Sequence, residues 1–395
     1  MFAALASKAS AQDASTVLNE QLQLGEVFSH QRLDVVDARQ QVGGSNTAIG
    51  NRIVGGTEQQ SLRFVNRQTG FAAAVAEARL NMQGQTRGPV VVVNQARINE
   101  ASVAANGAPL ALDSQQYAYG PAVSTVIQEN THARLIGGAA VTSAAYSNSL
   151  HAGGNNTFAS GTIHQESTEH TLAQTYVPAL YVPGQASFHA DAASNSVQVV
   201  TTGTSGQDLS VSQDNVGWTG AESVSVANNS WDTATTSSAA ANRALLYNAG
   251  GSQLTTTNQS NSGDVYSHAS AYAYEFGQVR AVADGVGNQA VSGNADIWVE
   301  IDNNQINTGG VAVTAYVTGH TGYDAYVGAN ATGNSVTGYA CSDCGGVLTA
   351  TNSQTNSGPV SAIANTNLTG GSRAVITGST ATGNSASFYV TRPGN

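Results

Sequence analysis

The chain has 395 residues, of which only 10% are charged and 43 are glycine, and its net charge at pH 7 is −11. Asn, Ser, Thr, Ala and Val make up most of the remainder, and large apolar residues are scarce. The negative charge argues against binding to nucleic acid or to an anionic membrane surface. The chain also has no run of 18 apolar residues that would predict a membrane-spanning helix.

The first residues, MFAALASKASAQDAS, contain an apolar run from Met1 to Ala6, and Ala9-Ser10-Ala11 after it has the small-residue pattern of signal-peptidase sites. That run is short for a complete signal, so residues 1–11 are interpreted as the remnant of a secretory signal; an ordinary chain terminus is the alternative. Residues 12–45 are richer in charge and in Leu. Within them, the stretch 14–40 is expected to be helical and to act as an N-terminal cap or docking segment.

Residues 52–57 read RIVGGT, the letters found at the activation site of trypsin-like serine proteases. A protease of that class needs a nucleophile, a base and an orienting acid, and the chain has neither a TAAHC-like nor a GDSGGP-like segment. The six-letter match alone therefore does not predict a protease. The wider segment GNRIVGG instead has the form of a repeat found further along the chain.

That repeat is defined by two motifs at fixed offsets. The pattern Gln-x-Asn-x-Gly occurs four times, with spacings of 46, 46 and 49 residues. A second Asn follows the motif Asn by 27, 27, 27 and 28 residues, at Asn242, Asn288, Asn334 and Asn384. Weaker copies of the first motif are placed at Gln165 and Gln128. Such self-similarity is typical of solenoids and propellers.

Side chains in the repeat alternate with period two, as on β-strands. After Gln259, one face carries Val265, Ser267 and Ala269, which suits a thin interior. Amides in register with that face can bond to the same amides on neighbouring rungs. The predicted structural ladder consists of Gln213, Asn215, Gln259, Asn261, Gln305, Asn307, Gln354 and Asn356.

The predicted fold is therefore an all-β, repetitive β-solenoid (β-helix) over residues 46–395, clearest over 213–395, behind the short helical or capping N-terminal segment. Half of the repeat, about 23 residues, is taken as one rung, which gives on the order of 15 rungs and a stack about 70 Å long. A β-propeller is the alternative, because 46 residues also fit a four-stranded blade.

The second face of one repeat is aromatic: it carries Tyr266, His268, Tyr272 and Tyr274, followed by Phe276. Flat tyrosine-rich surfaces can bind polysaccharide or protein. These first four residues are the candidate ligand-binding residues, and a solvent-facing strand surface without a ligand is the alternative.

Cys341 and Cys344 form the chain's single Cys-x-x-Cys pair. Zinc would need further ligands, so a local disulfide is predicted, with no metal and no cofactor. Candidate catalytic groups are sparse: acids lie at Asp284, Glu300 and Asp302, and a lyase-like pair could be made by Arg280 and Asp284. No catalytic residues are predicted.

Three segments carry a resemblance: the Gln-x-Asn-[Ser/Thr]-Gly repeats, GNSVTGYACSDCGG, and NSQTNSGPVSA at 352–362. Through them residues 213–395 resemble the holdfast-anchoring HfaD family of stalked alphaproteobacteria. The resemblance implies an exported, outer-membrane-associated protein of the cell surface that helps to fix an adhesive polysaccharide. It also implies a curlin-like surface protein and an outer-membrane secretion lipoprotein as partners, and it brings no catalytic residues.

Two functional classes therefore stay open. The first is a non-enzymatic adhesion or anchor protein of the cell surface, with self-association left open. The second is a carbohydrate-active β-helix protein, such as a polysaccharide lyase or a phage tail spike. An enzyme would concentrate acids and arginines in one cleft, and their scatter along this chain favours the first class.

Overall fold

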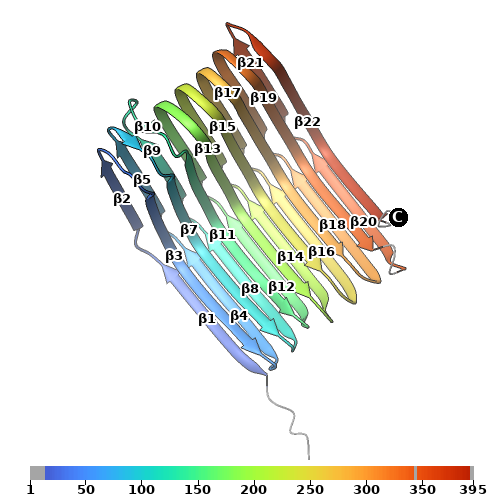
Figure 1. Ribbon diagram of the computed structural model, residues 1–395. Helices are drawn as coiled ribbons and strands as arrows, with labels where there is room; N and C mark the ends of the chain where they lie inside the picture. The colour runs from blue at the N-terminus through green and yellow to red at the C-terminus, as the bar shows by residue number, and fades with distance from the viewer. Residues whose placement is uncertain (1–13, 342–344, 392–395) are drawn as a thin grey trace, which may run out of the picture.

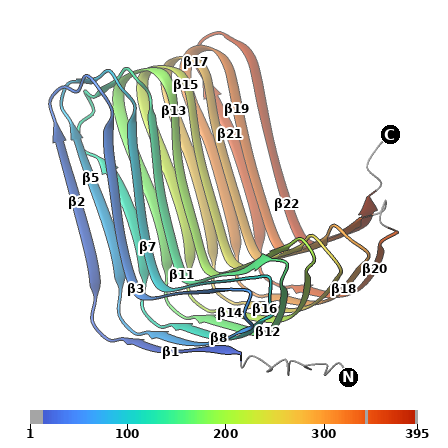
Figure 2. The same ribbon diagram turned by 60° about the horizontal axis from the view of Figure 1, so that its bottom comes forward.

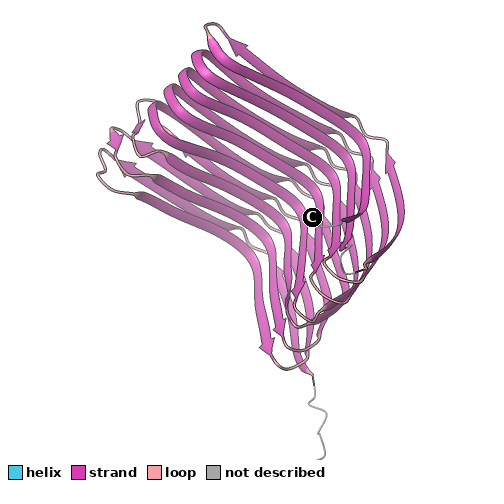
Figure 3. Cartoon of the chain, turned by 45° about the vertical axis from the view of Figure 1, so that its right-hand side comes forward, coloured by secondary structure: helices cyan, strands magenta, loops and turns pink. Residues whose placement is uncertain are grey.

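The computed structural model describes residues 14–341 and 345–391, and all of the regular secondary structure within these residues is β-strand (Figures 1 and 3). Neighbouring coils pair in parallel and follow one another in chain order from β1 to β22. The predicted all-β solenoid is confirmed, and the parallel stacking excludes the propeller, whose blades are separate sheets around a channel. Within the described residues there is no helix that could cross a membrane.

The strands have the following bounds: β1 Ser15–Gln23, β2 Val27–Val35, β3 Val42–Glu58, β4 Leu62–Gly70, β5 Ala74–Met82, β6 Gln85–Thr86, β7 Val90–Asn106, β8 Leu110–Ala118, β9 Ala122–Gln128, β10 Arg134–Leu135, β11 Ala139–Asn155, β12 Phe158–Ser167, β13 Thr171–Thr202, β14 Gly206–Asn215, β15 Thr219–Asn248, β16 Ser252–Asn261, β17 Val265–Asn294, β18 Trp298–Asn307, β19 Val311–Cys341, β20 Val347–Asn356, β21 Val360–Leu368 and β22 Ser372–Thr391.

Each coil has an L-shaped outline, with a long limb that stands upright and a short limb that lies at its foot (Figure 2). In a middle coil, β14 forms the outer layer of the short limb, and the first part of β15 forms the outer layer of the long limb. The chain turns at the tip of the long limb near residues 228–231. It then returns along the inner layer, bends near Asn242 and continues into the short limb.

One coil spans a whole repeat, so the expectation of a 23-residue rung is wrong. Residues 46 to 50 positions apart lie side by side on neighbouring coils, as Gln259 does with Gln213 and Gln354 with Gln305. Strands of the outer short limb form one 8-stranded sheet. At about 4.8 Å per step, its seven steps give a stack about 34 Å long, half the predicted length. The period-two pattern does not reveal how many strands one coil contains.

The expected helix in residues 14–40 is also wrong, because this stretch forms β1 and β2. β1 pairs with β4 so that Asn19 lies beside Asn66 and Gln21 beside Gln68. The Leu-rich, charged composition favours helix, but pairing with the next coil satisfies the backbone and outweighs that preference. Its role as a cap or docking segment stays a prediction.

A continuous ladder of glutamines crosses the elbow of the L. Each Nε2 donates to the Oε1 of the preceding coil at 2.7–2.8 Å and to a backbone carbonyl of the facing layer. Its members are Gln21, Gln68, Gln116, Gln165, Gln213, Gln259, Gln305 and Gln354. The position assigned to Gln128 is held by Gln116, and Gln128 pairs beside Leu80 on the long limb instead.

An asparagine ladder faces it from the inner layer and has the opposite polarity. Here each Nδ2 donates to the Oδ1 of the following coil at 2.8–2.9 Å. The members are Asn51, Asn99, Asn148, Asn195, Asn242, Asn288, Asn334 and Asn384. Asn51 belongs to GNRIVGG, so the register in β3 confirms that this segment is a copy of the repeat.

A third, shorter ladder lies at the outer corner of the elbow. Asn215, Asn261 and Asn307 each donate to the next Asn, ending at Asn356, at 2.7–2.8 Å. Each also donates to the carbonyl of the Gly two residues later in its own turn. Asn261 and Asn307 are fully buried, whereas Asn356 is half-buried in the last coil.

Apolar side chains fill both limbs on either side of this polar elbow. The long limb is packed with small residues such as Ala269, Ala271 and Val313. The short limb holds larger ones, including Phe64 and Leu209. Buried amides cost free energy unless they are paired, so the ladders fix the register of every coil while the apolar limbs supply the burial.

Candidate functional site

The predicted aromatic row lies on the outer face of the long limb. Tyr266 stacks on His268 with ring centroids 6.1 Å apart, and Tyr274 stacks on His320 of β19 at 4.9 Å. Tyr272 is half-buried on the same face. Phe276 does not continue the row: two consecutive exposed residues before it reverse the alternation, and it points inward with 5% of its surface exposed.

The pKa values of His268 and Tyr266 are both shifted so that the neutral side chain is favoured. His268 Nδ1 lies 2.7 Å from Thr314 Oγ1, and burial lowers the pKa of its imidazole, although Glu222 opposes the shift. Burial likewise raises the pKa of the Tyr266 phenol. Glu222 of the preceding coil lies beside His268, so the row has a carboxylate at its edge, and the imidazole already contacts Thr314 of the next coil.

A better-formed site lies at the tip of the long limb, where no site was predicted from the sequence. Three adjoining hollows share lining residues there, with volumes of about 540, 310 and 860 Å³. Trp231 and Tyr323 are common to the first two, with 60% and 53% of their surfaces exposed. We call this continuous depression the tip groove.

A glycine between the two aromatic residues creates the tip groove. In the register of the coils, Gly277 lies opposite Trp231 on one side and Tyr323 on the other. A Cβ at Gly277 would lie 2.5 Å from the Trp231 carbonyl oxygen and 2.8 Å from its indole. Without that Cβ the indole extends over β17 to meet the Tyr323 ring edge-on at 6.0 Å.

Polar groups line the rim of the tip groove. Asn229 Nδ2 donates to Glu275 Oε2 at 2.9 Å, beside the two aromatic rings. On the other side, Arg373 binds both carboxylate oxygens of Asp324, and its guanidinium lies 5.5 Å from the Tyr323 ring. The hydrogen bond from Arg373 holds the pKa of Asp324 below its usual value. The rim thus combines amide, carboxylate and guanidinium groups around an apolar floor.

Single-copy aromatic residues such as Trp231 and Tyr323 gave no repeated signal, which is why the sequence prediction missed them. A signal does exist in the aligned repeats: NSWDT, EFGQV and TGYDA occupy the same position in successive coils. A glycine flanked by two aromatic residues in one such column indicates a surface hollow.

The candidate catalytic groups are not brought together. Arg280 and Asp284 lie four residues apart on the same face of β17, about 13 Å along the strand. The Arg280 guanidinium lies over the Tyr326 ring at 5.3 Å, and Asp284 accepts a hydrogen bond from Asn330 at 2.8 Å. Glu300 and Asp302 lie on β18 of the short limb, away from both.

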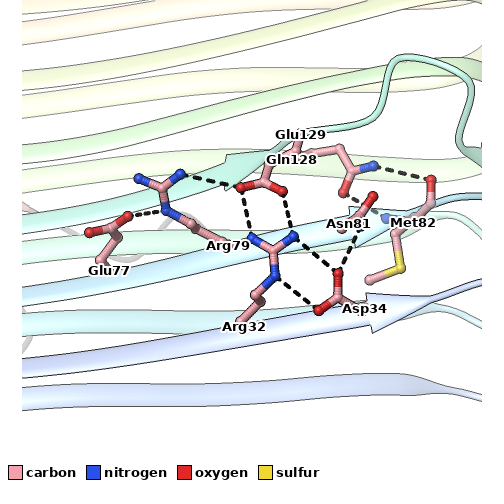
Figure 4. Close-up of polar contacts among 8 residues, drawn as sticks. All are labelled: Arg32, Asp34, Glu77, Arg79, Asn81, Met82, Gln128 and Glu129. Carbon is pink, nitrogen blue, oxygen red and sulfur yellow. Dashed lines mark hydrogen bonds and ion pairs between the residues drawn. The ribbon is translucent and has the colours of Figure 1, made fainter.

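Two charged clusters of the described residues are interpreted as structural. On the outer face of the first coils, Arg32 and Arg79 both bind Glu129, at 3.0 and 3.3 Å (Figure 4). Exposed pairs of this kind contribute little individually, but this one ties three coils together.

On the inner face near the elbow, Tyr146 donates to Asp191, which also pairs with Arg243 at 3.3 Å. We call these three residues the inner-face cluster. Burial alone would raise the pKa of Asp191, but the charge of Arg243 and the hydrogen bond from the Tyr146 hydroxyl outweigh burial, and the net shift of the pKa is downward.

Cys341 ends β19, whereas Cys344 lies outside the described residues. Their predicted disulfide stays a prediction.

The model of one protein family, holdfast attachment protein D, matches residues 36–310. The chain belongs to this family. The match includes the N-terminal third, where the sequence resemblance was not placed, and it ends before Cys341 and before Tyr323. It includes Trp231, Gly277 and the predicted aromatic row. No curated protein and no solved structure matches the chain.

Proposed function

We propose that this member of the holdfast attachment family works by binding and not by turnover, as a surface protein that anchors an adhesive polysaccharide to the outer membrane. The observation that carries the proposal is the family match over residues 36–310, which runs without interruption from before β3 to after β18. The attachment role is therefore assigned to the stacked coils themselves.

The architecture supports an anchoring role because it is held together along its whole length. Every coil within the stack pairs with both neighbours over long parallel strands, such as the 30 residues of β17. Three amide ladders add side-chain hydrogen bonds between the same coils. A force applied to one coil is thus shared by many bonds to the next.

Export to the cell surface and partnership with a curlin-like surface protein and an outer-membrane secretion lipoprotein belong to the same proposal. Self-association belongs to it as well, because repeated weak contacts gain strength through multivalency. Light scattering of the purified protein over a range of concentrations would test self-association. Co-purification from detergent-solubilised envelopes would test the two partners.

Deletion of the gene tests the proposed function. We expect cells of the deletion strain to synthesise the adhesive but to release it into the medium or leave it on the substratum. Complementation with the full chain should restore retention. Normal retention in the deletion strain would contradict the anchor role, and depolymerisation of the adhesive by the purified protein would contradict the non-enzymatic part of the proposal.

A further inference from the structure

We propose that the tip groove binds a short segment of an uncharged, pyranose-rich polysaccharide, with Trp231 and Tyr323 as the two stacking surfaces. The inference rests on the proposed function for the class of ligand, and it adds the site, the residues and the charge of the sugar. None of the predicted row residues lines the first hollow, which begins one residue beyond Tyr274, at Glu275.

The aromatic residues supply the apolar part of the recognition. Trp231 is 60% exposed and Tyr323 is 53% exposed, although large aromatic side chains are stabilised by burial. Gly277 leaves the space into which the indole extends, so the ring position is determined by the backbone of β17. A rigid, exposed pair of rings suits the flat C–H faces of pyranoses, which are apolar surfaces edged by hydroxyl groups.

The dimensions match a chain that lies along the stacking direction. The first hollow extends from Tyr181 in β13 to Tyr323 in β19, across four coils, or about 14 Å at 4.8 Å per step. The backbones of Trp231 and Tyr323 stand two coils apart, about 10 Å, but their rings meet edge-on with centroids 6.0 Å apart, so the pair forms the two sides of a corner that receives one pyranose ring of the chain. The volume of the first hollow, about 540 Å³, lies within the usual range of ligand sites.

The charge of the rim selects against acidic sugars. Three carboxylates line the hollows, those of Glu275, Asp232 and Asp324, together with two arginines. Arg373 is paired with Asp324 at 2.9 Å, and Arg280 lies over the Tyr326 ring in the largest of the three hollows. A polymer of uronic acids would bring further carboxylates to a groove whose lining already carries more carboxylates than guanidinium groups. Carboxylate and amide groups can instead bind hydroxyls, as acceptors and donors. An uncharged chain therefore complements the site better than a polyanion does.

Binding of defined oligosaccharides to the full-length purified protein tests the inference. The probes are cellohexaose and chitohexaose, which are uncharged, and hexagalacturonate, which is acidic. Titration calorimetry would measure affinity, and tryptophan fluorescence would report on the indole. We expect at least one uncharged probe to bind and to shift the emission to the blue, with no measurable binding of hexagalacturonate.

The variants locate the site. Trp231→Ala and Tyr323→Ala should each weaken binding about tenfold, whereas Trp231→Phe should keep most of it. Trp218→Ala is the matched control, because Trp218 is also exposed, at 36%, but lies against Gly220 at the foot of the long limb. Circular dichroism would verify that each variant keeps its β structure. Wild-type affinity in both alanine variants, tighter binding of hexagalacturonate, or no binding of either uncharged probe would overturn the inference.

A strain that carries only the Trp231→Ala, Tyr323→Ala chain separates this inference from the proposed function. Release of adhesive by this strain, with normal export of the variant, supports the groove. If the deletion strain releases its adhesive but the double variant retains it, the groove inference fails and the anchor role stands. If the deletion strain itself retains the adhesive, the anchor role fails.

Discussion

Replacement of one Asn of the asparagine ladder should lower the free energy of unfolding far more in the middle of the stack than at its end. Asn288 is fully buried; it donates to Asn334 at 2.8 Å and to the carbonyl of Ile306 at 2.9 Å, and it accepts from Asn242 at 2.8 Å. Asn288→Ala removes three hydrogen bonds, each worth about 1 kcal/mol, and leaves buried partners unpaired at further cost. We expect a loss of about 3–5 kcal/mol.

Asn384 is the matched control because it has the same side chain at the exposed end of the same ladder. It accepts one good hydrogen bond, from Asn334 at 2.8 Å, and its own donation to the Gln354 carbonyl is long, at 3.5 Å. Water can replace these partners at an exposed position, so Asn384→Ala should cost about 1 kcal/mol or less.

The substitution Asn288→Asp tests whether each position of the ladder needs a hydrogen-bond donor as well as an acceptor. The carboxylate can still accept from Asn242, but it cannot donate to Asn334 or to the Ile306 carbonyl. Burial and these facing oxygens should raise the pKa of the new carboxyl. At neutral pH this variant should therefore be less stable than Asn288→Ala, and it should regain stability relative to Asn288→Ala as the pH falls and the carboxyl becomes protonated.

Native-state hydrogen exchange is the suitable assay, because a stack of coils need not unfold in a single step. Peptides from β17 and its two neighbours should show the largest increase in exchange for Asn288→Ala. Equal losses for Asn288→Ala and Asn384→Ala would refute the idea that buried pairing in the ladder stabilises the elbow. An Asn288→Asp variant as stable as Asn288→Ala at neutral pH would refute the need for a donor at this position.

Three further outcomes are expected. Gly277→Ala should destabilise the tip and displace the Trp231 indole, because its Cβ would lie 2.5 Å from a backbone oxygen, whereas Gly378→Ala, with open space around it, should be neutral; differential scanning calorimetry and tryptophan emission would detect both effects. His268 has a lowered pKa, so its contribution to the free energy of unfolding should be fully present above the ordinary histidine pKa of about 6.5. This contribution should be lost as the pH drops below that value. Between pH 7 and pH 5, the free energy of unfolding measured with urea should fall less in His268→Gln than in the wild type. An equal fall in both proteins would contradict the assignment. Asp191→Asn should cost on the order of 2–3 kcal/mol near pH 6 by weakening the inner-face cluster; because the pKa of Asp191 is lowered, the difference from the wild type should persist near neutral pH and disappear only as the pH falls through that pKa.

The repeated part of the fold could be predicted because the same residue type recurs at the same position of each coil. Gln213, Gln259 and Gln305 occupy one column of the stack, and their spacing in the sequence is the length of a coil. The alternation of small and polar residues likewise identified the buried face of β17.

The errors come from features that a period of two cannot reveal. Alternation is the same whether a coil closes after one long strand or after several, so the 46-residue coil was taken as two rungs. Residues 14–40 were judged by composition, although Gln21 aligns with Gln68 of the glutamine ladder and Asn19 aligns with Asn66 of the next coil. The tip groove depends on Gly277, which acts through the absence of a side chain, and on two aromatic residues that occur once each in their column.

The L shape separates the surface available for a ligand from the part of the coil that holds the stack together. The tip groove lies at the free end of the long limb, whereas the buried glutamine and asparagine ladders lie at the elbow. A pull on a ligand at the tip would act along β15, β17 and β19, which pair with one another over most of their length. To slide one of these strands, the pull must break a row of parallel backbone hydrogen bonds and also shift a buried amide out of register with both neighbours. The residues at the tip can therefore differ from one coil to the next to suit a ligand: Trp231, Gly277 and Tyr323 occupy the same position in three successive coils. The elbow, in contrast, keeps the same Gln and Asn in every coil.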